Sequence, residues 1–421
     1  MATFFRLYRE AFRGLPREIW FLSFVLFINR SGTMVLTFLP LYLTRELGFD
    51  MVFAGHLLSV YGLGHLAGAL IGGWLTDRVG PLRIQGWALA TSGLGFFVFE
   101  FLRSPGGLLA ITFLVATAAE SFRPANGAAL AAFAPPQLRT RAVALNRMAL
   151  NLGFGVGPAV GGWLATYDYA WLFRVDGATC MAASVLLVVL FRGRKPIVAA
   201  STDDGADEPA TGHPFRDRSL LAFLALSMVF TLLFFQGWST YPIYMNDVYG
   251  FDEARFGLLL ALNAVLILLF EMVLTRAGEG FAPLRLAGLG ALLYGLGLAI
   301  LPLAPGVPLA VISVVVWTTG EMLFAPFAGG WIVNRASDRH RGKVMGLYTM
   351  AWGLGFVIAP TAGMWIYRHW GGTTLWLGVG VMAVLVALGF EILQRRVHRE
   401  ESGTLDTPEA LHAVPAEGSA G

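Results

Sequence analysis

The sequence predicts an all-α integral membrane protein, with about twelve transmembrane helices in two pseudo-symmetric six-helix bundles. Of its 421 residues, 56% are hydrophobic and 14% are charged, whereas soluble domains average roughly 45–50% apolar and 25% charged residues. Apolar stretches of about 18 to 28 residues recur from end to end, and about 20 such residues cross a bilayer as a helix. An internal repeat and one long polar break divide these stretches into two sets of six.

Charged residues and Pro/Gly-rich breaks delimit the apolar stretches. The spans that they predict are 19–43, 52–76, 84–102, 107–134, 142–166, 170–191, 219–244, 255–275, 285–303, 307–333, 344–367 and 373–393. The break between the sixth and seventh spans contains STDDGADEPATGHP, whose small and acidic residues are typical of a flexible linker. The expected organisation is a cytoplasmic N-terminal segment 1–18, a bundle 19–191, a cytoplasmic linker 192–218, a bundle 219–393 and a disordered cytoplasmic tail 394–421.

The basic residues predict the orientation of the chain. Of the 30 lysine and arginine residues, only Arg45, Arg103, Arg255 and Arg368 fall in the odd-numbered loops, and most of the others flank the even-numbered loops and the two ends of the chain. The positive-inside rule then puts both termini in the cytoplasm of a bacterium whose inner membrane the chain crosses several times. Topology explains the net charge of +3, and we expect no nucleic-acid partner.

The two halves repeat each other at an offset close to 200 residues. Arg139 and Arg141 fall opposite Arg339 and Arg341, and Glu120 falls opposite Glu321. Duplicated bundles around a midplane site are a recurring design of secondary transporters. A membrane receptor or regulator without transport activity is the alternative of another class, but such a protein would not require the repeat.

Several classes of chemistry find no support in the sequence. The single cysteine, Cys180, cannot form an intrachain disulfide, and no Cys/His spacing resembles a zinc site. No GxxxxGK[ST] loop for ATP and no defensible catalytic triad is present. We therefore expect no cofactor, no metal and no enzyme activity.

The loop after the second span carries the residues GGWLTDRVGPLRI. Glycines permit a tight turn there, and an aspartate can accept hydrogen bonds from a helix N-terminus or an arginine. The sequence resembles the loop 2–3 signature of the major facilitator superfamily, which implies a cytoplasmic gate that stabilises the outward-open state. Pro81 stands where that family usually has a basic residue. The gate residues would be Gly73, Asp77, Arg78, Gly80 and Arg83, with Arg141 from the loop before the fifth span.

The fifth span contains GFGVGPAVGG. Small residues let helices approach closely, and a proline bends the helix that contains it. The pattern resembles the antiporter motif of drug:proton exporters in the same superfamily, formed here by Gly153, Gly157, Pro158, Gly161 and Gly162. Simple helix packing is the alternative explanation.

The second span carries a ladder of small residues at Gly64, Gly68 and Gly72. Such ladders mark close helix packing, and we expect this one to face the eleventh span across the interface between the halves. His56 and His65 lie in the same span. We interpret them as hydrogen-bonded interface histidines rather than as titrating site residues.

Charged residues at mid-span are the best candidates for a functional site, because each costs several kcal/mol in a bilayer unless it is paired or hydrated. Arg30, Glu120, Arg123 and Glu321 all lie near the middle of their spans. In the superfamily the first, fourth, seventh and tenth spans line the central cavity, so the resemblance implies one substrate cavity that contains these four residues and Gln236. A structural ion-pair cluster is the alternative.

The two glutamates are expected to differ in role. Arg123 follows Glu120 by three residues, on the neighbouring helical face, whereas Phe324 has that position relative to Glu321. A nearby cation favours the carboxylate, and burial without one favours the protonated acid. We therefore expect Glu321 to carry the coupling proton. Glu120 is the second proton-coupling candidate, and it would form a polar network with Arg30 and Arg123.

The resemblance to the superfamily covers about residues 15 to 395. Within it, the sequences of the fourth, seventh and tenth spans resemble those of bacterial efflux carriers of the drug:proton antiporter type. The resemblance implies export of a small, lipophilic or drug-like solute in exchange for protons, by alternating access. Proton symport of a peptide, sugar or organic acid, gripped by Arg30 and Arg123, is the alternative with the same fold. The expected partners are a small-molecule substrate, protons and the lipid bilayer, and we expect a monomer.

Overall fold

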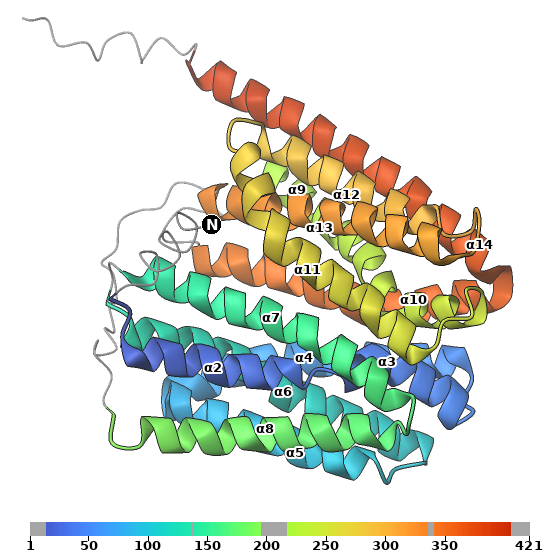
Figure 1. The fold of residues 1–421 in the computed structure, drawn as a ribbon. Helices are drawn as coiled ribbons and strands as arrows, with labels where there is room; N and C mark the ends of the chain where they lie inside the picture. The colour runs from blue at the N-terminus through green and yellow to red at the C-terminus, as the bar shows by residue number, and fades with distance from the viewer. Residues whose placement is uncertain (1–13, 136–137, 195–216, 336–340, 406–421) are drawn as a thin grey trace, which may run out of the picture.

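The computed structural model describes residues 14–135, 138–194, 217–335 and 341–405. Throughout these ranges the chain is helical with no β-strand, and its helices form two bundles that lie side by side (Figure 1). Most of the predicted linker, the first part of the N-terminal segment and the last part of the tail lie outside the described residues.

The first bundle contains helices α2 to α8 (Figure 1). Their bounds are α2 Arg17–Ser31, α3 Val35–Leu41, the π-helix η1 Tyr42–Glu46, α4 Met51–Val79, α5 Pro81–Phe99, α6 Pro105–Phe133, α7 Arg139–Ala165 and α8 Ala170–Phe191. The segments α2, α3 and η1 together make the first span. Asp50 caps α4 by accepting from the amide of Val52, and Gly80, with φ of 99°, makes the tight turn into α5.

The second bundle contains helices α9 to α14. Their bounds are α9 Arg218–Phe234, α10 Gln236–Asp247, α11 Glu253–Ala277, α12 Pro283–Ala299, α13 Val307–Arg335 and α14 Arg341–Leu405. The pair α9 and α10 makes the seventh span. Helix α14 contains the last two spans, which meet at Gly371, where φ is 82° and ψ is 163°. The described residues therefore form the twelve spans and two bundles that the sequence predicts.

Two spans that the sequence predicts as continuous helices are broken in their middle. Residues 32–34 separate α2 from α3, and Phe235 separates α9 from α10. Gly32 and Thr33 stand at the first break and Gln236 follows the second, but hydropathy averaged over a whole span does not record such local features. The breaks lie in the first spans of the two halves, and they expose backbone groups inside the protein that side chains must satisfy.

The predicted disordered tail is wrong over its first part, because α14 continues to Leu405. The continuation is stabilised by ion pairs along the helix, in which Glu391 pairs with Arg395 and Glu400 pairs with Arg396. Glu400 also pairs with Arg335 at the end of α13. These contacts hold a polar segment in helical form where composition alone suggests disorder.

The predicted partner of the glycine ladder is also wrong. A Cβ at Gly64 would lie 2.7 Å from the Phe113 carbonyl oxygen, and one at Gly68 would lie 2.4 Å from that of Thr117, both in α6. The ladder thus packs α4 against α6 within the first bundle. The glycine spacing predicts close packing correctly, but nothing in it specifies which helix approaches.

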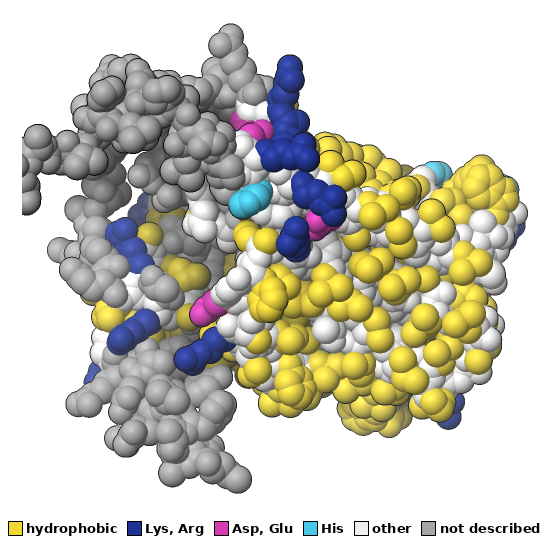
Figure 2. Space-filling model, turned by 90° about the horizontal axis from the view of Figure 1, so that it is seen from above, with side chains coloured by type: hydrophobic (Ala, Val, Ile, Leu, Met, Phe, Trp, Pro, Cys, Tyr) yellow, Lys and Arg dark blue, Asp and Glu magenta, His cyan; other side chains and the backbone are white. Residues whose placement is uncertain are grey.

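The surface is consistent with a membrane-embedded bundle. We call the end of the molecule where α8 ends and α9 begins the linker end, drawn at the left of Figure 1, and the opposite end the far end. Figure 2 shows basic and acidic side chains gathered toward the linker end, while the rest of that face is largely hydrophobic. Arg285 and Glu391 join α12 to α14 on this side.

Candidate functional site

The break in the first span is held by a carboxylate from another helix. Asp176 in α8 accepts hydrogen bonds from the amides of Met34, at 3.0 Å, and Val35, at 2.8 Å, where α3 begins. Its side chain is buried, so it takes the place of water at the helix N-terminus. At Gly32, beside the break, a Cβ would lie 1.9 Å from the Thr179 hydroxyl, which leaves room only for glycine. Asp176 is thus a cap rather than a partner of nearby Arg174, which pairs with Glu100.

Gln236 begins α10 directly after the break in the seventh span, and its side chain donates back to the Leu232 carbonyl before the break at 3.3 Å. Its amide nitrogen donates to the carbonyl of Ala359 in α14 at 2.9 Å, and its amide oxygen accepts from the Thr240 hydroxyl at 2.6 Å. Gln236 is 5% exposed, and Gly363 of α14 leaves the room for it. The structure therefore places Gln236 as a brace between α10 and α14.

Glu120 in α6 lies in a polar network of the first bundle. One carboxylate oxygen is 3.0 Å from His65 Nε2 in α4, and the other is 3.4 Å from Arg123 Nη1. Only 8% of the Glu120 side chain is exposed, against 66% for Arg123. The carboxylate is therefore enclosed, while the guanidinium extends from it.

Arg30 lies near the end of α2, in the same bundle. Its guanidinium lies over the Phe154 ring at 5.6 Å, and its Cβ fits against Gly153 in α7. It is near enough for its charge to act on both Glu120 and Tyr61. Its Nε is buried and has no hydrogen-bond partner among the described residues. The sequence-predicted group of Arg30, Glu120 and Arg123 is thus brought together in one bundle.

Glu321 lies apart from this group, in α13 of the second bundle. Its carboxylate accepts a hydrogen bond of 3.3 Å from Asn263 of α11, and the same amide donates to Thr318 at 3.0 Å. Among the described residues, no hydrogen bond or ion pair joins Glu321 to Arg30, Glu120, Arg123 or Gln236. The two predicted glutamates therefore have separate polar partners, each within its own bundle.

The two sites have equivalent architecture. In each bundle the glutamate stands on the fourth helix of the half, and its partner stands on the second: His65 on α4 for Glu120, and Asn263 on α11 for Glu321. Sequence reasoning missed both pairings. The signal was present in part, because the Gly64 to Gly72 ladder that packs α4 on α6 also brings the adjacent His65 toward Glu120.

Close backbone contacts between α7 and α11 join the bundles. A Cβ at Gly162 would lie 2.3 Å from the Glu253 carbonyl oxygen, and one at Gly257 would lie 2.4 Å from that of Pro158. Arg147 and Glu271 form an ion pair farther along the same two helices. The rest of the predicted antiporter motif faces the first span, with Gly157 against Ser31 and Gly161 against Met34. The motif is therefore enclosed between α2, α3 and α11.

At the far end, ion pairs connect the bundles. Glu253 at the start of α11 pairs with Arg45 at 3.0 Å and accepts a hydrogen bond from the Tyr169 hydroxyl. Asp50 at the start of α4 pairs with Arg368 at 3.3 Å. These contacts join the two bundles at the far end in the described conformation.

At the linker end, the predicted gate residues make no such connection. Asp77, Arg83 and Arg141 are exposed, and Arg78 stacks on Trp74 at 4.0 Å within α4. Gly73 has open space beside it. Within the described ranges, no hydrogen bond or ion pair links these residues to the second bundle.

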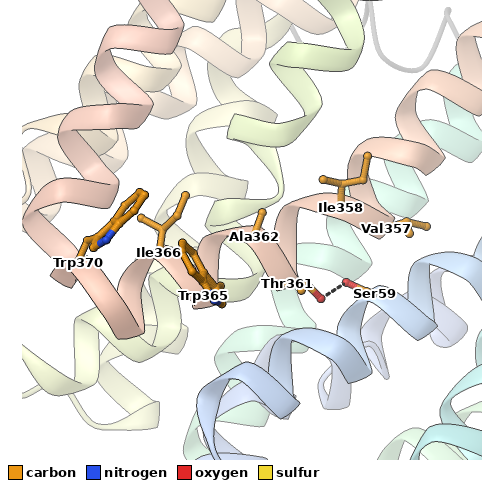
Figure 3. A pocket seen from close by; sticks show the side chains of 8 residues that line it. All are labelled: Ser59, Val357, Ile358, Thr361, Ala362, Trp365, Ile366 and Trp370. Carbon is orange, nitrogen blue, oxygen red and sulfur yellow. Dashed lines mark hydrogen bonds between the residues drawn. The ribbon is translucent and has the colours of Figure 1, made fainter.

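The interface between α4 and α14 is the second contact between the bundles. It extends from Gly55 against Pro360 to Gly353 against Leu66. Ser59 and Thr361 share a hydrogen bond of 2.8 Å on it. Beside this hydrogen bond lies an open, largely apolar groove of about 570 Å³, in which Trp365 and Trp370 stand along α14 (Figure 3).

Comparison with known proteins is consistent with this architecture. Among curated relatives, a "Na(+), Li(+), K(+)/H(+) antiporter" of Planococcus maritimus is 27% identical over 79% of this chain and 85% of its own. The "Multidrug resistance protein MdtH" of Edwardsiella ictaluri is 25% identical over 76% of this chain and 79% of its own. A POT family transporter, solved in complex with 5-aminolevulinic acid, superposes with a TM-score of 0.78 at 17% identity, covering 92% of this chain and 98% of that one.

The model of one protein family covers almost the whole described chain. The Major Facilitator Superfamily matches residues 19–252 and 232–417. Together with the duplicated six-helix bundles, the match establishes that this multi-pass membrane protein belongs to the Major Facilitator Superfamily of transporters.

Proposed function

We propose that the protein is a secondary active exporter, which moves a small, lipophilic or drug-like solute out of the cell in exchange for protons. The observation that carries the proposal is the pair of enclosed glutamates, Glu120 and Glu321, at equivalent positions of α6 and α13. Alternating access would expose them to one side of the membrane and then to the other.

The proton carrier in this proposal is Glu321. Asn263 is its hydrogen-bond partner and carries no charge, so a carboxylate there has no adjacent cation to offset the cost of burial. Binding a proton removes that cost. Glu120, with His65 and Arg123 beside it, would keep its charge and orient the arginines toward the solute.

Two observations support export as the direction of transport. The curated relatives at 25–27% identity include proteins named as a multidrug resistance protein and as a cation/proton antiporter. Gly153, Gly157 and Gly161, in the segment that resembles the antiporter motif, pack on the first span. We place the protein in a bacterial inner membrane with both termini in the cytoplasm, as the loop charges predict.

A second candidate function is proton-coupled uptake of an organic acid. The observation that favours it is the presence of two guanidiniums, those of Arg30 and Arg123, in the same bundle as Glu120, with Arg123 at 3.4 Å from the carboxylate. A substrate carboxylate could bind both. The two candidates predict opposite proton movements when solute is added, so one assay separates them.

Purified protein in liposomes with an imposed pH gradient tests the proposal. An exporter reconstituted in a known orientation should accumulate a lipophilic cationic dye against its gradient as protons flow the other way. Glu321→Gln should abolish this accumulation but keep dye-for-dye exchange, because the neutral side chain mimics the protonated acid. Glu279→Gln, in an exposed turn after α11, is the matched control and should behave as the wild type.

Two outcomes would contradict the proposal. Full proton-driven accumulation by Glu321→Gln would remove Glu321 from coupling. Proton movement in the same direction as the solute would replace export by symport. If neither dyes, drugs nor organic acids move under any gradient, a receptor without transport activity becomes the better explanation.

A further inference from the structure

His65 has two kinds of neighbour at once. Toward the first bundle, its Nε2 meets Glu120 at 3.0 Å, with 26% of its side chain exposed. Toward the second bundle, its ring meets the edge of Phe356 in α14, with centroids 6.1 Å apart. It therefore links a buried carboxylate to the interface between the two halves.

The contact continues into the broken seventh span. Phe356 stacks on Phe235, with centroids 4.3 Å apart and 8° between the planes. Phe235 is the residue at which α9 gives way to α10. A continuous series of contacts thus extends from Glu120 through His65 and Phe356 to the hinge-like break of the opposite bundle.

His65 also lies at a boundary of the α4 and α14 interface. Its neighbour Leu66 fits against Gly353. On another face of α4, Gly64, Gly68 and Gly72 pack against α6. A change at His65 therefore acts between the face of α4 that meets the second bundle and the face that packs within the first.

The partners of the two glutamates differ in chemistry. An amide such as that of Asn263 neither gains nor loses a proton, whereas an imidazole is the side chain whose charge normally changes between about pH 5 and 8. We infer that His65 is a second proton-binding residue of the transport cycle, which donates its Nε2–H to Glu120 Oε2 and so couples protonation to the α4–α14 interface. This inference rests on the proposed proton-coupled function.

The proton step changes the local charge by one. Because Nε2–H of His65 already donates to Glu120, a proton taken from water binds at Nδ1. It converts the pair of neutral imidazole and carboxylate, of charge −1, into a pair of net charge zero. The charged groups that face the pair are Arg123 on α6 and Arg30 on α2. Tyr61 of α4 lies nearby, and α14 presents the uncharged Phe356 and Gly353. After protonation, the charge of Glu120 is balanced in part by His65. The electrostatic attraction between Glu120 and the two arginines is therefore weaker, including the ion pair with Arg123.

Spin labels across the interface test the inference without any solute. Leu70 of α4 and Met350 of α14 are exposed by 74% and 52%, and both lie toward the linker end. Both are changed to cysteine in a Cys180→Ala background, and electron–electron distances are measured from pH 5 to pH 8.5 in lipid nanodiscs. We expect the distance distribution to change in a single pH step in the protein with native His65.

The critical variant is His65→Asn, which copies the Asn263 arrangement and keeps a hydrogen-bond donor to Glu120. We expect it to lose the pH step, and His65→Gln to do the same. The matched control is His56→Asn, an exposed histidine of the same helix, which should keep the step. Thermal unfolding of each variant verifies that the loss does not come from misfolding.

Transport assays then separate this inference from the proposed function. With the pH step lost, His65→Asn should still move solute but with fewer protons per solute and a flatter pH profile. A step that persists in both His65 variants, or that is absent from the wild type, overturns the inference. A wild type that shows the step but transports nothing contradicts the proposed function alone.

Discussion

The carboxylate of Asp176 in α8 accepts a hydrogen bond of 2.8 Å from the backbone amide of Val35, and so satisfies this amide at the break of the first span. The two residues are separated by 141 positions in the chain. Inside a bilayer each unsatisfied backbone group costs several kcal/mol, so a broken helix needs such a partner. Helix α8 therefore stabilises the break between α2 and α3.

Removing this cap should destabilise the protein. Asp176→Leu leaves the amides of Met34 and Val35 without acceptors, at a cost of about 1–3 kcal/mol for each buried group. Asp176→Asn keeps one acceptor and should cost less. Thermal unfolding in detergent measures both variants. Asp168→Asn, at the exposed start of α8, is the control and should change stability little, because asparagine caps a helix as well as aspartate does. Equal losses at the two sites would contradict the role of Asp176.

Glu253 should hold the far end closed. Glu253→Gln keeps a hydrogen bond to Tyr169 but loses the charge that pairs with Arg45, so the open far-end population should rise. Spin labels at exposed Tyr167 and Val248, on opposite bundles, measure that population as longer distances.

The control for this prediction lies on the same helix. Arg255→Gln changes an exposed charge two residues from Glu253 and should leave the distances unchanged, whereas Arg45→Gln should reproduce the effect of Glu253→Gln. Identical distances in all of these proteins would show that the ion pair does not affect the closed state.

The overall fold was predictable because the bilayer fixes how long an apolar helix must be. The twelve spans follow from that constraint. The breaks at 32–34 and Phe235 did not follow from it. The side chains that compensate them, Asp176 at the Val35 amide and Tyr294 at the Phe234 carbonyl, act through tertiary contacts that hydropathy does not record.

The candidate site was predictable in its members but not in their arrangement. Mid-span charges identify Glu120 and Glu321 because unpaired charge is costly in lipid. Their partners depend on how helices pack side by side: His65 reaches Glu120 because the glycine ladder faces α6, whereas we expected it to face α14. A period of small residues specifies a close approach without specifying the neighbour.

The close contact between α7 and α11 should not tolerate added volume. Gly162→Ala would place a Cβ 2.3 Å from the Glu253 carbonyl oxygen, so the helices must separate. Overpacking of this kind typically costs about 1–3 kcal/mol, and we expect lower thermal stability with impaired transport. Gly127→Ala, within α6 and beside open space, should be neutral or slightly stabilising because alanine favours helices. Loss of stability at Gly127 but not at Gly162 would refute this account of the interface.

The ion pair between Asp217 and Arg335 should make stability depend on pH at the linker end. Asp217 lies just before α9, where burial raises the pKa of its carboxyl group, but hydrogen bonds from Arg335 and from the Leu220 amide outweigh burial and lower the pKa below 3.8. A group with a lowered pKa in the folded state stabilises the protein above its unfolded pKa, and that stabilisation is lost as the pH falls through the folded value.

The expected result is a loss of stability as the pH falls below about 4, the unfolded value for aspartate. Asp217→Asn should already lack this contribution at pH 6, and its unfolding temperature should fall less than that of the wild type between pH 5 and pH 3. Arg335→Gln should show the same flattening, because it removes the cation that favours the charged carboxylate. The measurement is the unfolding temperature of the wild type and the two variants between pH 5 and pH 3. If the three proteins show the same dependence of unfolding temperature on pH, Asp217 is not the titrating group.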